Sequence, residues 1–455
     1  MSGHAGDALS ELERFTYQPS ASTTAVQQQH KRQRTAEKAA VDAAELLAEA
    51  EKDLEQSQVD VAQVDVNSMK RMVLSVEKRI NENMQMRMKY PDRPEKFMDS
   101  ELELYQELKR LHVLATAPEL FPTFVKTRCI PSLLGLLAHE NSDISIDVVD
   151  LLHELTDVGE ADTADSLALL DCLYENDVHT LLMQHMTRLN EGEEDDAAAM
   201  HATLSTIESL IELKPDVAVT VAQKGGLMKW LLNRLKPRAF HANKLFASEL
   251  LAVLLQQNSD NQLFLGTVDG ILSLLTAASQ YKRREPQDME EAELVENVFA
   301  SMASALAEPA NQHLFLKAEG IELMVLTIKE RRYASHGALK VLNAALQGNG
   351  ANCERFVDIR GFKTLFPMIG SQPPPLPPFA KGSGEKRTAQ TQHDEHFTSV
   401  LCTLFAALSG ERRQRLLGKF AEDNMAKLDK LLELHIAYSK RVTLAEEGVA
   451  EVHVD

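Results

Sequence analysis

Three carboxylates at helical spacing are the first candidates for chemistry in this 455-residue sequence. Asp147, Asp150 and Glu154 lie three and four residues apart in the stretch 145–157, so they share one face of a predicted helix. Apolar residues such as Val148 occupy the opposite face. Carboxylates on an exposed helix face bind Lys and Arg side chains through charge-assisted hydrogen bonds.

Two later stretches, 201–213 and 243–255, repeat this arrangement with Glu208, Glu212 and Glu249. Lined up along a groove, these carboxylates would form an acidic surface for Lys/Arg-rich protein segments. The formal net charge of -20, from 68 acidic and 48 basic residues, favours such partners and disfavours direct contact with a nucleic-acid backbone. The alternative is that these are ordinary solvated helix faces.

Catalytic, cofactor-binding and metal-binding motifs are not found in the sequence. Ser75 and Lys78 fit an S-x-x-K pattern, but they lie on a predicted amphipathic helix without supporting motifs. The glycine-rich stretch 382–388 lacks the ending of a phosphate-binding loop. His179 and His185 are six residues apart, the wrong spacing for two metal ligands on one helix face, so we expect them at the surface or the edge of the core. Since the four cysteines form no C-x-x-C pair either, the sequence predicts no enzyme, cofactor or metal site.

The N-terminal region holds a candidate signal for nuclear import. Lys31, Arg32 and Arg34 form a short basic cluster within the polar stretch 1–35, which we expect to be disordered. The alternative is a solvated charge cluster. Residues 36–56 are strong helix formers with few large apolar side chains, and they predict an exposed helix. No apolar run reaches the length of a membrane span, so we expect a soluble protein inside the cell.

The remainder of the chain contains internal repeats. The string NQLFLGTVDGILSLL at 261–275 returns as NQHLFLKAEGIELMVL at 311–326, with a Gly nine residues after the Asn in both copies. Leu-rich runs of this kind begin at Ile130, Val178, Leu227, Ile271, Ile321 and Phe362. Their separations of 48, 49, 44, 50 and 41 residues are typical of armadillo or HEAT repeats, whose helical units bury their apolar faces only against one another.

Each repeat is predicted to contain three helices, with the Leu-rich run as the second. The third helices are expected at 145–157, 201–213, 243–255, 293–306 and 335–346. They would line the concave groove of an all-α, armadillo-type right-handed solenoid. Gly226, Gly270, Gly320 and Gly361 precede four of the runs, where we expect a left-handed or sharply bent backbone between two helices.

The predicted domain organisation has six parts. They are a largely disordered arm at 1–65, an N-terminal helical cap at 66–122, armadillo-like repeats at 123–370, a Pro-rich flexible linker at 371–396, C-terminal helices at 397–440 and a tail at 441–455. The proline run of the linker also matches ligands of SH3 or WW domains, which is the alternative interpretation.

Four strings carry a resemblance to a known family. KYPDRPEKFMDSELEL at 89–104, SLLGLLAHENSDISIDVVDLLHELTDV at 132–158, ANKLFASELLAVLLQ at 242–256 and NCERFVDIRGFKTLFPM at 352–368 closely resemble the beta-catenin-like family. The resemblance covers roughly 66–440 and implies a nuclear armadillo scaffold that associates with the spliceosome through the Myb-type splicing factor of the nineteen complex. It also implies recognition of basic nuclear-localisation segments of partner proteins, without enzymatic activity.

Family members usually continue through a further helical segment beyond the position of Asp455, so the functions of that segment, self-association included, are left open. An importin-like nuclear transport adaptor is the main alternative, but Trp230 and Asn233 have the wrong spacing for its Trp and Asn pairs. A catenin-class signalling protein would need a basic groove, which the net charge disfavours. We expect neither nucleic acid nor membrane as a direct partner.

Overall fold

The computed structural model describes residues 64–157, 163–369, 371–376 and 383–452. Every regular element in these ranges is a helix. The chain divides into two compact units at Asn176 and Asp177, which we call unit 1 and unit 2. The predicted import cluster and the helix expected at 36–56 lie outside the described residues.

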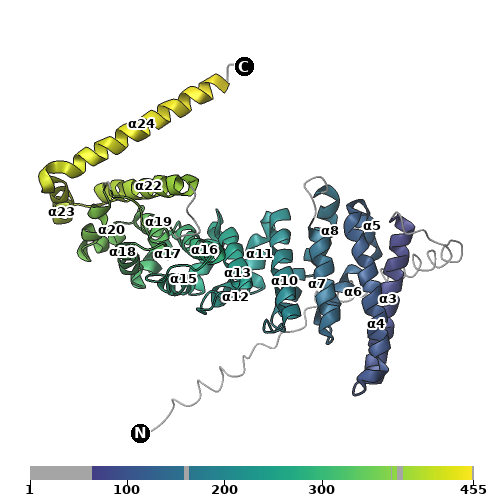
Figure 1. Cartoon of the computed structure of the whole chain (residues 1–455). Coiled ribbons are helices and arrows are strands. Elements are labelled where there is room, and N and C mark those ends of the chain that lie inside the picture. Colours follow the sequence, from purple (N-terminus) through teal and green to yellow (C-terminus); the bar gives the residue numbers. More distant parts are fainter. Residues whose placement is uncertain (1–63, 158–162, 370, 377–382, 453–455) are drawn as a thin grey trace, which may run out of the picture. The chain divides into compact units, whose positions relative to one another are not determined.

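The described part of unit 1 consists of α-helices joined by short 3₁₀ turns. These α-helices are α3 (Val66–Lys89), α4 (Met98–Leu111), α5 (Phe121–Thr127), α6 (Ile130–Gly135), α7 (Ser142–Thr156) and α8 (Thr163–Glu175). Asp65 and Ser68 form a capping box that satisfies backbone N–H groups at the start of α3. Helix α4 packs between α3 and α7, and α5 packs on α8 (Figure 1).

The described part of unit 2 is a stack of helices. They are α9 (Val178–Met186), α10 (Glu194–Leu213), α11 (Ala218–Lys224), α12 (Leu227–Arg234), α13 (Ala242–Leu255), α14 (Ser259–Thr267), α15 (Gly270–Ser279), α16 (Met289–Ala305), α17 (Pro309–Lys317), α18 (Gly320–Glu330), α19 (Ala334–Leu346), α20 (Gly350–Asp358), α21 (Phe362–Leu365), α22 (Ser383–Ala407), α23 (Gly410–Ala421) and α24 (Ala426–Val452).

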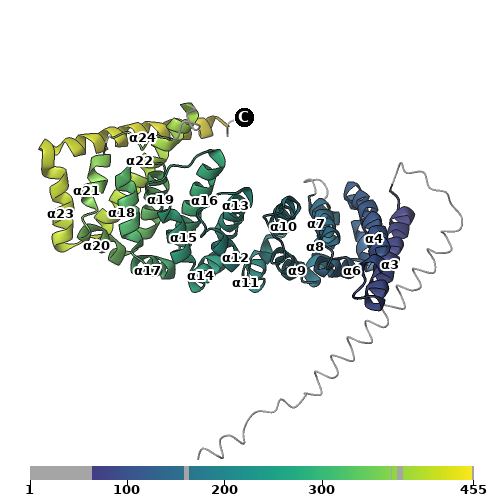
Figure 2. The same ribbon diagram turned by 60° about the horizontal axis from the view of Figure 1, so that its bottom comes forward.

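The helices of unit 2 pack in three rows, which Figure 2 shows side by side. The first helices of the repeats, α11, α14 and α17, contact one another in sequence, as do the second helices α12, α15, α18 and α21. The third helices α10, α13, α16, α19 and α22 form the most extensive row. This stacking confirms the predicted all-α armadillo-type fold, because each repeat buries its apolar side chains against its neighbours.

The repeated asparagines join each repeat to the third helix before it. The Nδ2 group of Asn261 donates to the Leu254 carbonyl at 3.0 Å, and that of Asn311 donates to the Ala305 carbonyl at 2.8 Å. Asn352 makes the same contact at the end of α19. Carbonyls in the last turn of a helix lack a partner within that helix, and the buried amides supply one. The Ala305 carbonyl also accepts from the backbone N–H of Glu308 at 3.3 Å.

Three of the four glycines before the Leu-rich runs differ from the predicted left-handed conformation. Gly226 has the expected left-handed backbone, with φ of 79°. At Gly320, however, the preceding Glu319 takes the left-handed conformation, with φ of 58°. Gly320 is needed for space, because a Cβ there would lie 2.5 Å from the ring of Phe315. The equivalent glycines before the second helices α15 and α21 pack in the same way, so three of the four serve close packing.

The region predicted as a flexible linker at 371–396 is partly helical. Helix α22 begins at Ser383, packs on α19, and takes the position of the third helix in the last repeat. Its polar sequence suggested a loop, but burial of Ala389 and Phe397 stabilises the helix, because tertiary packing overrides local composition. Helix α24 likewise extends to Val452, across part of the predicted tail.

Candidate functional site

The carboxylates predicted on α7 are engaged within unit 1. Asp147 is only 1% exposed, and its Oδ1 atom lies 2.5 Å from Lys109 Nζ of α4 and 3.5 Å from Nε2 of His112. The other ring nitrogen of His112 lies 2.7 Å from Glu154 Oε2. The expectation that Asp147 offers a free carboxylate on a groove is therefore wrong, because Lys109 of the adjacent helix α4 already neutralises it.

The charges of this cluster compensate one another. Burial opposes the charge on His112, but hydrogen bonds to Asp147 and Glu154 outweigh it and raise the pKa of the imidazole. Lys109 has a raised pKa for a similar reason. Burial raises the pKa of the half-buried Asp150, while Lys109 lowers it. The structure thus places the three predicted residues on one helix, where Asp147 and Glu154 form ion pairs with Lys109 and His112 and the charge of Lys109 acts on Asp150.

Unit 2 carries carboxylates on three successive third helices. Burial raises the pKa of Glu208 on α10, and the charges of Glu212 and Glu249 raise it further. Burial also raises the pKa of Glu249 on α13, with a further contribution from Glu293 on α16. The neighbouring charges that act on these two half-buried groups are all carboxylates, so a cation placed beside them would be stabilised.

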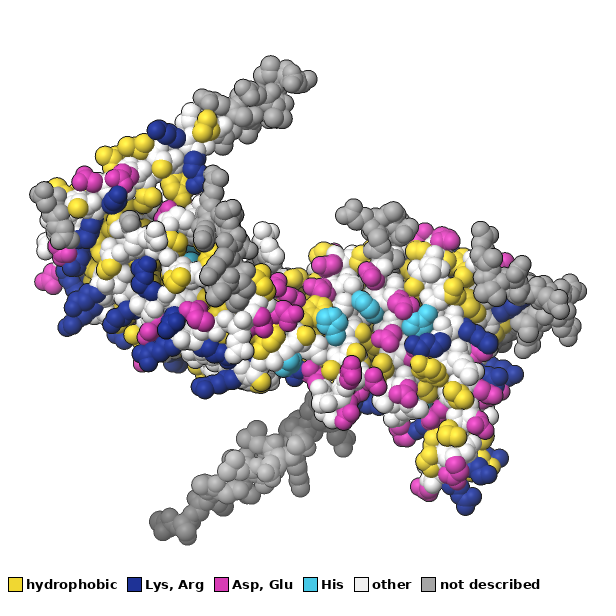
Figure 3. Space-filling view, viewed as in Figure 1, with side chains coloured by type: hydrophobic (Ala, Val, Ile, Leu, Met, Phe, Trp, Pro, Cys, Tyr) yellow, Lys and Arg dark blue, Asp and Glu magenta, His cyan; other side chains and the backbone are white. Residues whose placement is uncertain are grey.

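We call Glu208, Glu212, Glu249 and Glu293 the acidic face. In Figure 3, acidic side chains gather over α13 and α16, whereas Lys and Arg side chains gather toward α18 and α20. Sequence reasoning placed Glu208, Glu212 and Glu249 on third helices, as the structure does, but did not single out Glu293. The signal for Glu293 was available, since it lies in the stretch 293–306 that was predicted to form the next third helix.

The other residues that the sequence analysis weighed as metal ligands or catalytic groups have structural positions. His179 and His185 are buried in α9, not at the surface or core edge as expected. Lys78 of the S-x-x-K pattern lies 3.9 Å from Glu82 in an exposed ion pair. Within the described residues, no group of three or more His, Cys, Asp or Glu side chains is arranged to hold a metal ion.

None of the helices in the described ranges alone has the length and apolar composition to cross a bilayer. Two pairs, 118–127 with 130–138 and 259–267 with 270–279, meet those criteria only when joined across bends of 83° and 82°.

Comparison with known proteins agrees with the stacked three-helix repeats. A family model described as catenin-beta-like, Arm-motif containing nuclear, matches residues 43–454. The chain belongs to this catenin-beta-like family. It is 42% identical over 391 residues to beta-catenin-like protein 1 of Homo sapiens and of Bos taurus, an alignment that covers 85% of this chain and 68% of each relative.

The catenin-beta-like relationship extends to fungi. The beta-catenin-like protein 1 homolog of Schizosaccharomyces pombe is 33% identical over 390 residues, which cover 84% of this chain and 66% of that protein. Among solved structures, a crystal structure of an engineered protein aligns with a TM-score of 0.46 and 14% identity over 79% of both chains. The family description supplies the Arm motif and the nuclear setting, whereas the charges described above are properties of this chain.

Proposed function

We propose that this catenin-beta-like chain is a non-catalytic scaffold of the pre-mRNA splicing machinery in the nucleus. It binds Lys/Arg-rich, nuclear-localisation-type segments of partner proteins along the acidic face of unit 2. The observation that carries the proposal is a run of carboxylates across three neighbouring third helices, α10, α13 and α16. Besides burial, the charge of Glu249 raises the pKa of Glu208, and the charge of Glu293 raises the pKa of Glu249. The splicing role and the expected partner, the Myb-type splicing factor of the nineteen complex, rest on the family resemblance.

The acidic face suits an extended basic peptide for two physical reasons. The half-buried positions of Glu208 and Glu249 reduce solvent screening, so a charge-assisted hydrogen bond there is stronger than on an open surface. The carboxylates also repel one another in the free protein, and a bound Lys or Arg relieves that repulsion.

A peptide titration tests the proposal. A fluorescent peptide from the basic segment of the Myb-type splicing factor would be titrated into the full chain and into the Glu249→Gln/Glu293→Gln variant. We expect the variant to bind about tenfold more weakly at low salt, with a smaller difference at high salt because salt screens the attraction.

A matched control is the Asp216→Asn/Asp260→Asn variant, which removes the same formal charge from exposed positions outside the third-helix row. The control should bind like the wild-type chain if the location of the charge matters. Equal weakening in both variants would show that net charge alone attracts the peptide, and unchanged binding in both would reject the acidic face.

The importin-like alternative gains no support from the described third helices. Asn243 of α13 donates to the Ala197 carbonyl at 3.0 Å, and Asn297 of α16 donates to Ser248 Oγ at 3.2 Å. Trp230 lies on the second helix α12, where the Arg234 guanidinium sits 5.7 Å from its ring centroid. These asparagines hold neighbouring helices together and have no Trp partners in the third-helix row.

A further inference from the structure

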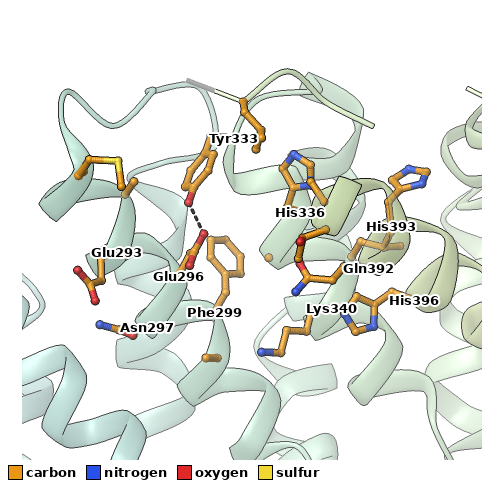
Figure 4. Close-up of a pocket in the computed structure, with 18 residues that line it drawn as sticks. Glu293, Glu296, Asn297, Phe299, Tyr333, His336, Lys340, Gln392, His393 and His396 are labelled. Carbon is orange, nitrogen blue, oxygen red and sulfur yellow. Dashed lines mark hydrogen bonds between the residues drawn. The ribbon is translucent and has the colours of Figure 1, made fainter. Parts of the chain in front are cut away.

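A cavity of about 700 Å³ lies on the third-helix row, between α16, α19 and α22. Figure 4 shows α16 on one side, with Glu293, Glu296 and Phe299. Glu293 belongs both to this lining and to the acidic face, so the acidic face leads directly into the cavity. The cavity thus gives the acidic face a recess at the α16 end.

The α16 side of the cavity combines carboxylates with aromatic rings. Glu293 and Glu296 are exposed, and Glu296 accepts a hydrogen bond from the hydroxyl of Tyr333. The rings of Phe299 and Tyr333 are buried and form part of the lining. Aromatic faces and carboxylates both attract a planar guanidinium, which stacks on rings and bonds carboxylates with two N–H groups at once.

The opposite side, formed by α19 and α22, has a different character. His336, His393 and His396 line it, and burial lowers the pKa of each imidazole, so they are neutral at pH 7. Nε2 of His336 lies 3.1 Å from the Pro374 carbonyl, which fixes this ring. Lys340 adds a positive charge on this side. This asymmetry directs an incoming cation toward the carboxylates of α16.

We infer that the cavity is an anchor pocket for one arginine side chain of the bound basic segment, with its guanidinium held by Glu293 and Glu296 beside Tyr333. The inference rests on the proposed binding of basic segments and adds a preference for arginine over lysine. A lysine ammonium meets the same charges, but it is a compact, strongly hydrated ion that neither stacks as a plane nor bonds a carboxylate in bidentate fashion.

Two acetylated probes, hexaarginine and hexalysine, test this preference on the full chain. We expect wild-type protein to bind hexaarginine about tenfold more tightly than hexalysine. The Ala300→Phe variant places a bulky ring in the cavity without changing any charge, since Ala300 lies in the lining. The Glu296→Gln variant removes one carboxylate at an exposed position and retains an acceptor for Tyr333. Both variants should bring the ratio of the two affinities close to one.

The Glu208→Gln/Glu249→Gln variant separates this inference from the proposed function. It should weaken both peptides alike and leave their ratio unchanged, because it removes charges of the acidic face outside the cavity lining. An unchanged ratio in both Ala300→Phe and Glu296→Gln would overturn the anchor pocket while leaving the acidic face in place. If every variant, the double variant included, bound both peptides with the affinity of the wild-type chain, the acidic face would be overturned as well.

Discussion

The two units carry similar rows of carboxylates on their third helices, yet the surroundings of those carboxylates differ. In unit 1, Asp147 is buried against Lys109 and His112, and Glu154 completes the network. In unit 2, the charges that act on Glu208 and Glu249 come from other carboxylates. The same sequence pattern therefore forms an internal ion-pair network in one unit and an uncompensated acidic face in the other.

The difference shows that charge spacing along one helix does not determine its role. The role of the carboxylates depends on whether an adjacent helix supplies a cation. Helix α4 places Lys109 beside α7, whereas α10 places a further glutamate beside Glu249. In our proposal, the compensated cluster contributes to stability, and the acidic face of unit 2 binds the ligand.

The largest expected effect is the removal of the cation from unit 1. Lys109→Met leaves Asp147 buried with only His112 nearby, and we expect the free energy of unfolding to fall by about 2–3 kcal/mol. This is less than for a fully buried pair because the Lys109 side chain is 45% exposed. Urea denaturation would measure the loss. Lys78→Met, at an exposed ion pair of the same unit, is the control and should change stability by less than about 0.5 kcal/mol.

The second effect is an opposite response to pH of two histidines, His112 in unit 1 and His393 in unit 2. His112 has a raised pKa, so its stabilising contribution is present below about pH 6.5 and is lost as the pH rises through the folded-state pKa. His393 has a lowered pKa, so its contribution is present above about pH 6.5 and is lost as the pH falls through the folded-state pKa. His112→Gln should thus cost more stability at low pH, and His393→Gln more at high pH. Denaturant titrations on both sides of pH 6.5 would show this crossing, and costs independent of pH would contradict it.

The smallest effect concerns the stability of the acidic face itself. Glu249→Gln removes repulsion from Glu208 and Glu293, so the free energy of unfolding should rise by about 0.3–0.5 kcal/mol. A shift in the urea midpoint at constant slope would record it. A clear loss of stability would mean that Glu249 has a cationic partner in solution, which would remove the contrast between the units.

The repeats were predictable because their signals are local. Asn261 and Asn311 occupy the same position in two copies of the repeat. The structure shows why, since each side-chain amide donates to a carbonyl at the end of a third helix. The role of Gly320 was not predictable in this way, because the reason for it is contact with a Phe315 ring and not its own backbone angles.

The candidate site was only partly predictable. The burial of Asp147 depends on Lys109 from a different helix, and a helix pattern does not contain that information. The cavity beside Tyr333 needs α22 to pack on α19, and the polar sequence at the start of α22 suggested a loop. Local patterns thus predicted the elements, whereas contacts between elements determined which charges remain available.

The most direct test sets the two acidic clusters against each other with one basic peptide. The same fluorescent peptide would be titrated into Asp150→Asn/Glu154→Gln in unit 1 and Glu208→Gln/Glu249→Gln in unit 2, with folding checked by circular dichroism. We expect about a tenfold loss of affinity in the unit 2 variant and less than about a twofold loss in the unit 1 variant. A tenfold loss confined to the unit 1 variant would contradict the account and move the binding site to α7.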